Sequence, residues 1–511
     1  MELASLAAVP LLALLLLLLL LAYLVRLNGL MSGTPDEVRQ LSPTRWTPEQ
    51  LRETYRRLEA NPITPATYRT KIPAKLERRY IVTGGSGLVG GYIILQLLER
   101  GTPPAAIRNV DFQPPHRADM LTGAAASVPH QPVDIASAAS TRAAFAAPWD
   151  AAVAGLPLTV FHAAAVIVPS DRSPRAYGLC EAVNVRGTRH VVDAARAAGA
   201  DVLVATTSGS IALRPVRFWK APWHVLAGRW PDRFWQLLDE RDFFAGPVRP
   251  RHHFHANYSA SKAEAERIVC AANQPALRTG CIRPANSVYG ILADTVLGVP
   301  LQRRTCPQWI AHITQSFAHG ANVAVAHLQL EAVLAPGPGR AGAPQAGRPF
   351  VVTDPNGPIT YGDLYAALTT LVRAPLRRLR LAPLPVLLLA HAVEAYCDGR
   401  AAVGAPAWLP PVTGELGLVK PAIFSIVTHL IARSDAAARS VADGGLAYTG
   451  VVTTLDGMVM ELVEWNWEMQ AQAEGKGKAK GDKAASITRG SSLSLADELQ
   501  RLAVVTTSVG G

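Results

Sequence analysis

The chain has 511 residues, of which 49% are hydrophobic and 17% are charged, and its formal net charge is +11. A chain of this length and composition can bury a large core, which excludes a globally disordered protein. Its five cysteines are widely spaced and contain no CxxC pair, so we predict neither a disulfide framework nor a metal site. The basic residues are spread along the chain without a stripe of interleaved aromatics, so we predict no nucleic-acid partner; the positive charge favours an anionic membrane or a cofactor.

Residues 1–28 are predicted to form a transmembrane anchor. Residues 3–25 are almost all apolar, and as a helix they would be about 34 Å long at about 1.5 Å per residue, enough to cross a bilayer. A cleaved signal peptide is the alternative, but the run is longer than the apolar part of a signal and no basic cluster precedes it. Arginines follow the run at positions 26, 39 and 45, so we expect the rest of the chain on the cytosolic side, at the endoplasmic reticulum membrane.

Residues 29–78 are polar and rich in proline, which predicts a stalk or linker. One helix is expected within it at residues 48–58, because Thr47 is a suitable N-cap and Pro48 a suitable first helical residue. From residue 79 to residue 300, short apolar runs alternate with alanine-rich helical segments. This alternation predicts an α/β class, a doubly wound parallel sheet of the Rossmann type.

Residues 301–467 are less regular and are predicted to form a smaller C-terminal substrate lobe. Within this lobe, residues 381–393 are apolar but too few to span a bilayer, and they follow a cluster of arginines. They are expected either to lie in the membrane interface or to form a buried helix. Residues 468–511 have lysines among glycine, alanine and serine, which predicts a disordered tail.

A glycine-rich string, TGGSGLVG at residues 83–90, follows a predicted strand at residues 80–82 and precedes a predicted helix at residues 91–98. This context is typical of a dinucleotide-binding loop, in which glycines permit a tight turn and the close approach of the pyrophosphate. The N-terminus of the following helix supplies free N–H groups for the phosphates. The candidate phosphate-binding residues are Gly84, Gly87, Leu88, Val89 and Gly90.

Asp111 ends the next predicted strand, residues 107–112, where its carboxylate can bind the adenosine ribose hydroxyls and repel a 2′-phosphate. The expected cofactor is therefore NAD. NADP remains an alternative cofactor because Arg108 or Arg117 could bind its 2′-phosphate. Asp134 is expected to end a third strand and to accept a hydrogen bond from the adenine amine, although a loop aspartate explains it equally well.

The candidate catalytic residues are Tyr258 and Lys262, in the string YSASK, with a serine from another segment. A spacing of four places the phenol and the ammonium on one helix face, where the cation would lower the pKa of the phenol. Lys262 could also hold the nicotinamide ribose. A predicted strand at residues 201–206 precedes Ser208, which we expect to polarise the substrate oxygen; Ser210 or Thr207 could take this role if the turn is shifted.

Several strings occur in the order that is typical of the extended short-chain dehydrogenases, and the chain resembles this family. They are the TGxxGxxG loop, FHAAA at 161–165, NVRGT at 184–188, YxxxK, Arg283-Pro284 and Tyr289-Gly290. Two later strings, ANVAVAHL at 321–328 and VVTD at 351–354, are similar to the branch of 3β-hydroxysteroid dehydrogenase/isomerases and sterol dehydrogenases. The resemblance covers residues 79–465. The residue before Asn322 is alanine, whereas many relatives have an acidic residue there, which leaves the finer subfamily unassigned.

The resemblance implies a role for each matching position. Ser208, Tyr258 and Lys262 would be the catalytic residues, and the last two would also contact the cofactor. The loop glycines and Asp111 would bind the dinucleotide. The nicotinamide half would be lined by Ala163, Ala164, Ala165 and Pro284. Asn184 would orient the site or simply pack a helix.

The expected function is the NAD-dependent oxidation of a 3β-hydroxyl on a steroid or sterol by a membrane-bound enzyme. Its expected partners are a lipophilic alcohol or ketone and membrane lipid, and the sequence leaves a homodimer open. A reductase or epimerase of another alcohol, such as a flavonoid, a polyketide or a sugar nucleotide, is the alternative within the same enzyme class. A catalytically silent NAD-binding membrane protein is the alternative outside that class. The segment between Ser208 and Tyr258 is rich in tryptophan and phenylalanine and could cap a sterol, pack on the membrane or form ordinary core.

Overall fold

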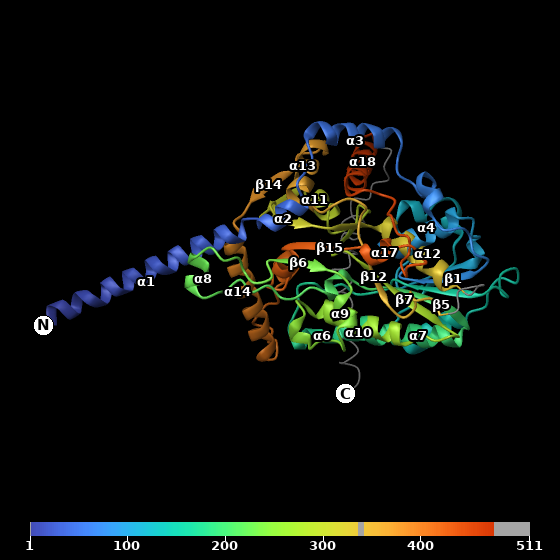
Figure 1. Ribbon diagram of the computed structural model, residues 1–511, viewed down its shortest axis with the longest axis horizontal. Coiled ribbons are helices and arrows are strands. Elements are labelled where there is room, and N and C mark those ends of the chain that lie inside the picture. The colour runs from blue at the N-terminus through green and yellow to red at the C-terminus, as the bar shows by residue number, and fades with distance from the viewer. Residues whose placement is uncertain (1, 336–341, 475–511) are drawn as a thin grey trace.

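The computed structural model describes residues 2–335 and 342–474 of the chain (Figure 1). Most of the predicted disordered tail, residues 475–511, lies outside these ranges. Its first residues were wrongly assigned, because helix α18 (Thr454–Ala473) continues through residues 468–473.

A parallel sheet of seven strands forms the main layer, in the order β12-β7-β5-β4-β1-β2-β3. All six neighbouring pairs are parallel, which confirms the predicted doubly wound Rossmann fold. The chain order reverses between β1 and β4, the place where such sheets bind ligands. The strands are β1 (Arg79–Thr83), β2 (Ile107–Asp111), β3 (His130–Pro132), β4 (Leu158–His162), β5 (Ala200–Thr206), β7 (Arg278–Pro284) and β12 (Pro349–Val352).

Helices cover both faces of this sheet, because successive strand side chains point to opposite sides. Tyr80 and Val82 pack in one apolar cluster with α4 (Leu88–Glu99) and α12 (Gly320–Leu334). Ile81, between them, packs in another cluster with α7 (Gly187–Ala197) and α10 (Asn257–Ala271). Both clusters consist of buried apolar side chains, so the strands are apolar throughout, as in a parallel sheet that is covered on both sides.

The second lobe is built around a smaller sheet of four strands, in the order β13-β10-β15-β6. The predicted boundary at residue 300 does not separate two independent units. Strand β6 belongs to the first half of the chain yet pairs with β15, while β12 and α12 from the second half complete the main sheet. The pairing of strands that are distant in the sequence decides this arrangement. The strands are β6 (Trp235–Leu238), β10 (Thr314–Gln315), β13 (Ile359–Thr360) and β15 (His429–Ala432).

The segment that was predicted as a stalk is part of the folded body. Helix α3 (Pro48–Ala60) begins as expected, with the Thr47 side chain accepting a hydrogen bond from the backbone of Gln50. Its apolar face is buried against α13 (Tyr361–Leu371) and α18, and Asn466 of α18 donates to the Tyr55 hydroxyl at 3.1 Å. The apolar stripe of α3 therefore makes it a packed helix of the second lobe, above the small sheet in Figure 1.

Helix α1 (Glu2–Met31) projects from the body as a long apolar rod (Figure 1). By length and composition it is the one helix in the described part of the chain that can cross a membrane. Its last residues, Leu27, Leu30 and Met31, are buried in the core of the second lobe. The apolar segment 381–393 lies in helix α14 (Pro383–Ala402), which packs against α1 with one side and leaves the other side exposed.

The remaining elements are short. The α-helices among them are α2 (Asp36–Leu41), α5 (Ala138–Ala146), α6 (Tyr177–Cys180), α8 (Pro222–Leu226), α9 (Arg241–Phe244), α11 (Gly298–Arg303), α15 (Gly414–Leu418), α16 (Ile423–Ile426) and α17 (Asp435–Ala438). The strands among them are β8 (Ser287–Tyr289), β9 (Thr305–Gln308), β11 (Phe317–His319) and β14 (Arg377–Arg380).

Candidate active site

The glycine loop turns sharply between β1 and α4. Gly84 has a φ of +71°, and a Cβ there would lie 2.6 Å from the backbone nitrogen of Ala164. At Gly90 a Cβ would lie 2.2 Å from the carbonyl oxygen of Gly84. Gly87 caps α4, and the nearest atom to a Cβ there is the Gly84 oxygen at 3.3 Å. Gly84 and Gly90 thus allow close backbone packing. Gly87 leaves space in front of the N-terminus of α4, where a pyrophosphate fits.

Replacing Gly90 with alanine is expected to destabilise the loop by about 1–3 kcal/mol, the usual cost of forcing an extra methyl group into a packed site. NAD affinity should fall with it, because the backbone of Gly84 must move. Isothermal titration with NAD and thermal unfolding measure the two effects. Gly155→Ala is the matched control, since nothing lies within 4 Å of a Cβ at Gly155. Equal NAD affinities for the two variants would contradict the inference that close packing at Gly90 is needed for NAD binding.

Asp111 lies at the carboxyl end of β2, as predicted, and its carboxylate faces the glycine loop. One oxygen accepts a hydrogen bond from the Ser86 backbone at 3.0 Å and the other accepts from the Gln113 backbone at 3.1 Å. Burial raises the pKa of Asp111, and these two N–H groups oppose the rise. The carboxylate is thereby fixed beside the loop, in a position where it can accept hydrogen bonds from the hydroxyls of a ribose.

The two arginines that kept NADP open are engaged elsewhere. Arg108 donates to three backbone carbonyls, each at 2.9 Å, and lies over the ring of Trp149. Arg117 forms an ion pair with Asp119 at 2.6 Å and donates to the Leu88 carbonyl at 3.1 Å. Both side chains are buried, so neither is placed as an exposed phosphate ligand.

Of the two interpretations of Asp134, the structure agrees with the loop aspartate and not with the strand end. Strand β3 ends at Pro132, two residues earlier, and Asp134 is exposed in the loop that follows. Its carboxylate accepts a hydrogen bond from the Ala136 backbone at 2.8 Å. This local turn contact accounts for the aspartate by itself, because aspartate side chains commonly bond the backbone two residues on.

The residues expected near the nicotinamide lie at neighbouring strand ends. The Ala163 backbone, after β4, donates to the Thr83 carbonyl at 2.9 Å, so Ala163, Ala164 and Ala165 run beside the glycine loop. Pro284 ends β7, and its carbonyl oxygen would lie 2.8 Å from a Cβ at Gly209. The sheet therefore brings these residues to the same carboxyl edge as the Ser208 turn.

Ser208 follows β5 and meets Tyr258 of α10. The Ser208 hydroxyl forms a hydrogen bond with the Ser210 hydroxyl at 2.8 Å, and it lies close enough to the Tyr258 phenol to lower the pKa of that phenol. Thr207 points elsewhere, since its hydroxyl donates to Glu266 at 2.9 Å. Of the three hydroxyl residues considered, Ser208 is therefore the one that the structure brings to the phenol, and Ser210 supports it.

The ammonium of Lys262 lies one turn along the same helix and donates to the Thr206 carbonyl at 2.7 Å. Burial lowers its pKa to about 8. The pKa of Tyr258 moves in the opposite direction to the expected one. Burial raises it to about 12, and the nearby Ser208 hydroxyl only partly opposes this rise. Desolvation of the phenolate outweighs the cation, which is directed at a backbone carbonyl of β5.

Glu266, which the sequence analysis did not single out, ties the catalytic segments together. It is buried on α10, four residues after Lys262, and accepts hydrogen bonds from the Thr207 hydroxyl at 2.9 Å and from Nε and Nη2 of Arg283, at 2.7 and 2.6 Å. Arg283 is fully buried and also pairs with Asp242 at 2.7 Å. The ion pair thus connects α10 with the ends of β5 and β7. The sequence signal that could have identified Glu266 is its position four residues after Lys262, which places the two side chains on the same helix face.

Asn184 supports the site from behind. Its amide accepts from the Val166 backbone at 2.9 Å and donates to the Val166 carbonyl at 3.0 Å and to Ser261 at 2.9 Å. It therefore joins the loop after β4 to the helix that carries Tyr258 and Lys262. Both expected roles, orientation of the site and helix packing, are compatible with these contacts.

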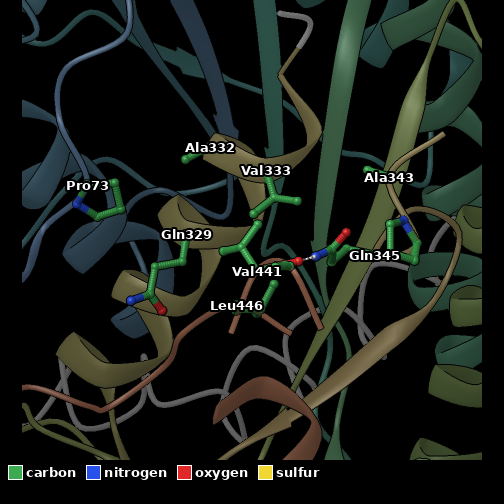
Figure 2. Close-up of a pocket in the computed structure, with 10 residues that line it drawn as sticks. Pro73, Gln329, Ala332, Val333, Ala343, Gln345, Val441 and Leu446 are labelled. Carbon is green, nitrogen blue, oxygen red and sulfur yellow. Dashed lines mark hydrogen bonds between the residues drawn. The ribbon is translucent and has the colours of Figure 1, made fainter. Parts of the chain in front are cut away.

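A cavity of about 450 Å³ lies away from these residues, beside α12 (Figure 2). Gln329 and Gln345 are among its lining residues, and the Gln345 amide donates to the Val441 carbonyl at 2.8 Å. None of the ten described residues that line it is a candidate cofactor or catalytic residue. This cavity is therefore separate from the candidate active site.

Two family profiles match the chain. One is described as the 3-beta hydroxysteroid dehydrogenase/isomerase family and matches residues 81–216; the other is described as Male sterility protein and matches residues 158–319. The chain is 25% identical over 314 residues to the 3beta-hydroxysteroid-dehydrogenase/decarboxylase isoform 2 of Arabidopsis thaliana, which covers 58% of this chain and 47% of that protein. It is 31% identical over 142 residues to the 3-beta-hydroxysteroid dehydrogenase of Mycolicibacterium neoaurum, covering 26% and 33% of the two chains. The chain spans less than half the length of these curated relatives.

Solved structures with a similar arrangement include a short-chain dehydrogenase/reductase superfamily protein from Agrobacterium tumefaciens with bound NAD. It is 15% identical, with a TM-score of 0.48, and the match covers 78% of this chain and 99% of that one. The UDP-glucose 4-epimerase of Thermotoga maritima, solved with UDP-glucose, is also 15% identical with a TM-score of 0.48, and covers 77% and 99%. The fold assignment itself rests on the strand order and parallel register.

Proposed function

We propose that the chain is an extended short-chain dehydrogenase/reductase of the 3-beta hydroxysteroid dehydrogenase/isomerase family, and that it oxidises the 3β-hydroxyl of a steroid or sterol to a ketone with NAD. The matches to the two family profiles and to the curated relatives support this proposal. The observation that carries the proposal is the arrangement of Ser208 beside the Tyr258 phenol, with Lys262 one turn along the same helix and bonded to the end of β5. The names of the curated relatives support the substrate class. Helix α1 is the proposed anchor, with the catalytic body on the cytosolic face of the endoplasmic reticulum membrane.

Each residue has one task in this proposal. Ser208 donates a hydrogen bond to the substrate oxygen and holds it against Tyr258, whose oxygen takes the hydroxyl proton. NAD, when bound, supplies the acceptor for the hydride that leaves the carbinol carbon. Lys262 retains its positive charge at neutral pH, since its pKa is about 8, and so favours the ionised phenol once substrate and cofactor exclude water. In the cofactor half, the glycine loop and the α4 N-terminus hold the pyrophosphate, and Asp111 holds the adenosine ribose.

The proposal is tested with the full-length chain, purified and reconstituted in lipid, a 3β-hydroxysteroid, and either NAD or NADP. We expect steroid-dependent NADH formation, with a higher kcat/KM for NAD than for NADP. If no 3β-hydroxysteroid is oxidised with either cofactor while NAD still binds, the substrate proposal fails and the fold assignment stands. Oxidation of a different class of alcohol instead would reassign the substrate and leave the catalytic residues in place.

The cofactor preference is expected to depend on Asp111. The Asp111→Asn variant keeps an oxygen for the Ser86 backbone but removes the charge that repels a 2′-phosphate. Juxtaposed like charges cost up to several kcal/mol, and about 1.4 kcal/mol is tenfold, so the ratio of kcat/KM for NADP to that for NAD should rise about tenfold or more. Asp134→Asn, in an exposed loop, is the control and should leave the ratio unchanged. An unchanged ratio in Asp111→Asn would remove the carboxylate from cofactor selection.

A further inference from the structure

Helix α14 has an apolar face on its exposed side. Its buried side packs on the body through Leu384, Leu387, Ala390 and Val393. The exposed positions between residues 383 and 395 are Pro385, Leu388, Leu389, Ala392 and Ala395, and none of them is polar; the first exposed polar residue on the helix is Asp398, near its C-terminal end. Helices on the surface of soluble proteins normally direct polar residues outward, and a helix that is apolar all round is otherwise found in a core or against lipid. The outward face of the first three turns of α14 therefore lacks the polar side chains that contact with water would favour.

A second exposed apolar surface lies on the aromatic segment that contains α8. Phe218 and Val225 are buried, whereas Trp219, Trp223 and Leu226 are exposed, Trp223 to 68%. The segment thus has an inner apolar side that fills the core and an outer side with two tryptophans. Tryptophan is enriched where protein surfaces meet the membrane–water interface, because its ring is apolar and its N–H is polar. The sequence analysis left membrane packing and core packing open for this segment; its residues divide between a buried side and an exposed one.

Both surfaces adjoin α1 at one level along its axis. The Tyr23 hydroxyl donates to the Lys220 carbonyl at 3.2 Å, just before α8, and Asn28 accepts from the Leu384 backbone at 3.1 Å, in the first turn of α14. Trp219 donates to His391 of α14 at 3.1 Å and joins the two surfaces to each other. In Figure 1, α8 and α14 both lie below α1, next to the place where it leaves the body.

This level is where the apolar run of α1 ends. Exposed leucines continue along α1 as far as Leu21, Val25 is the last exposed apolar residue, and Arg26 follows beside Gly228. If α1 crosses a bilayer, Tyr23 to Arg26 must lie at the headgroups, since an arginine avoids the hydrocarbon region. The two surfaces then lie at the same depth as those headgroups.

We propose that these two surfaces form an interfacial collar that rests in the headgroup region of the bilayer around α1. The collar is defined by Trp219, Trp223, Leu226, Pro385, Leu388 and Leu389. Its occupant is a lipid bilayer with anionic headgroups, because exposed arginines border it at positions 217 and 229 beside α8 and at 378 and 380 before α14. The body thus docks on the membrane along one side of the molecule in addition to being tethered by α1.

Native tryptophan fluorescence tests the collar in the full-length chain without any turnover. The chain is reconstituted in vesicles of phosphatidylcholine and phosphatidylserine, in which the phosphatidylcholine has brominated acyl chains that quench nearby tryptophans. We expect Trp219→Phe/Trp223→Phe to lose much of the quenching seen in the wild type. Trp467→Phe is the control, because Trp467 is also exposed, to 37%, but lies on α18 away from the collar, and it should leave the quenching unchanged.

A second variant keeps both tryptophans and alters the partner surface. Leu388→Asp/Leu389→Asp places two carboxylates on the exposed side of α14 and should also decrease the quenching, whereas Leu121→Asp, an exposed leucine outside the collar, should not. Equal quenching in wild type and both collar variants overturns the proposal. It is also overturned if crosslinking shows that a second copy of the chain covers Trp223 and shields it from the brominated lipid.

Discussion

Replacement of Tyr258 by phenylalanine is expected to lower kcat for alcohol oxidation by about 10²–10⁴-fold, the usual contribution of a positioned general base. The variant removes one oxygen, which lies beside Ser208 and would receive the substrate proton. The glycine loop and Asp111 are untouched, so NAD should bind as in the wild type. Steady-state kinetics with a 3β-hydroxysteroid and titration with NAD measure the two quantities separately.

Tyr177→Phe is the matched control for this variant. Tyr177 is a buried tyrosine on the neighbouring helix α6, and its hydroxyl donates to Glu264 of the same helix that carries Tyr258, at 2.8 Å. Its loss should change kcat little. The assignment of Tyr258 as the base fails if Tyr258→Phe retains the steroid-dependent NADH formation of the wild type.

The pH dependence provides a second measure of the same residue. Burial raises the pKa of Tyr258 to about 12, so the phenol is protonated at neutral pH and its basic form increases with pH. The kcat/KM for oxidation should therefore rise from pH 6 towards pH 9, and the rise should be absent in Tyr258→Phe. In the free protein the pKa of Lys262 is about 8, so this lysine loses its charge at the upper end of the range. Lys262→Arg stays charged there and should extend the rise.

The second large effect is expected on stability. Arg283→Met should lower the free energy of unfolding by about 3–5 kcal/mol, because it leaves the buried Glu266 carboxylate without its cation. Asp242 is more exposed and can be solvated instead. Urea unfolding of the full-length chain, followed by circular dichroism, measures the change. Arg241→Met is the control: its ion pair with Asp239 lies at the surface and contributes less than about 1 kcal/mol.

A double variant distinguishes the unpaired charge from lost packing. Arg283→Met/Glu266→Leu removes both charges and replaces them with apolar groups, so it should recover much of the loss, since buried ion pairs are often replaceable in this way. No recovery would mean that packing of the guanidinium, and not its charge, provides the stability. A loss in Arg283→Met no larger than in Arg241→Met would contradict the importance of the buried pair altogether.

Local sequence patterns predicted those parts of the fold whose cause is local. The alternation of short apolar runs with helices predicted the parallel sheet, and β1, β2 and β5 lie within a residue or two of their expected bounds. The glycine loop was recognisable because a tight turn between strand and helix requires particular residues at fixed spacing. Thr47 and Pro48 likewise marked the start of α3. The position of Asp111 beside the cofactor loop could be predicted because Asp111 ends the strand that follows the loop and its helix.

Other expectations were wrong because contacts between distant segments decide them. A polar, proline-rich composition predicted a stalk at residues 29–78, yet the apolar stripe of α3 finds a partner in α18, some four hundred residues later in the chain. Strand β3 ends earlier than expected, so Asp134 lies in a loop. The division at residue 300 was wrong for the same reason, since β12 completes the main sheet from the second half of the chain.

The sequence by itself determined the fold class, the cofactor loop and the residue types of the catalytic segment, because turn geometry, helical spacing and strand periodicity are properties of neighbouring residues. Only the tertiary structure decided how those residues behave. It selected Ser208 over Thr207 as the partner of Tyr258, directed Lys262 at a carbonyl of β5 and placed Glu266 against Arg283. It also decided the direction of the Tyr258 pKa, because desolvation depends on every segment that covers the phenol and not on the spacing to one lysine.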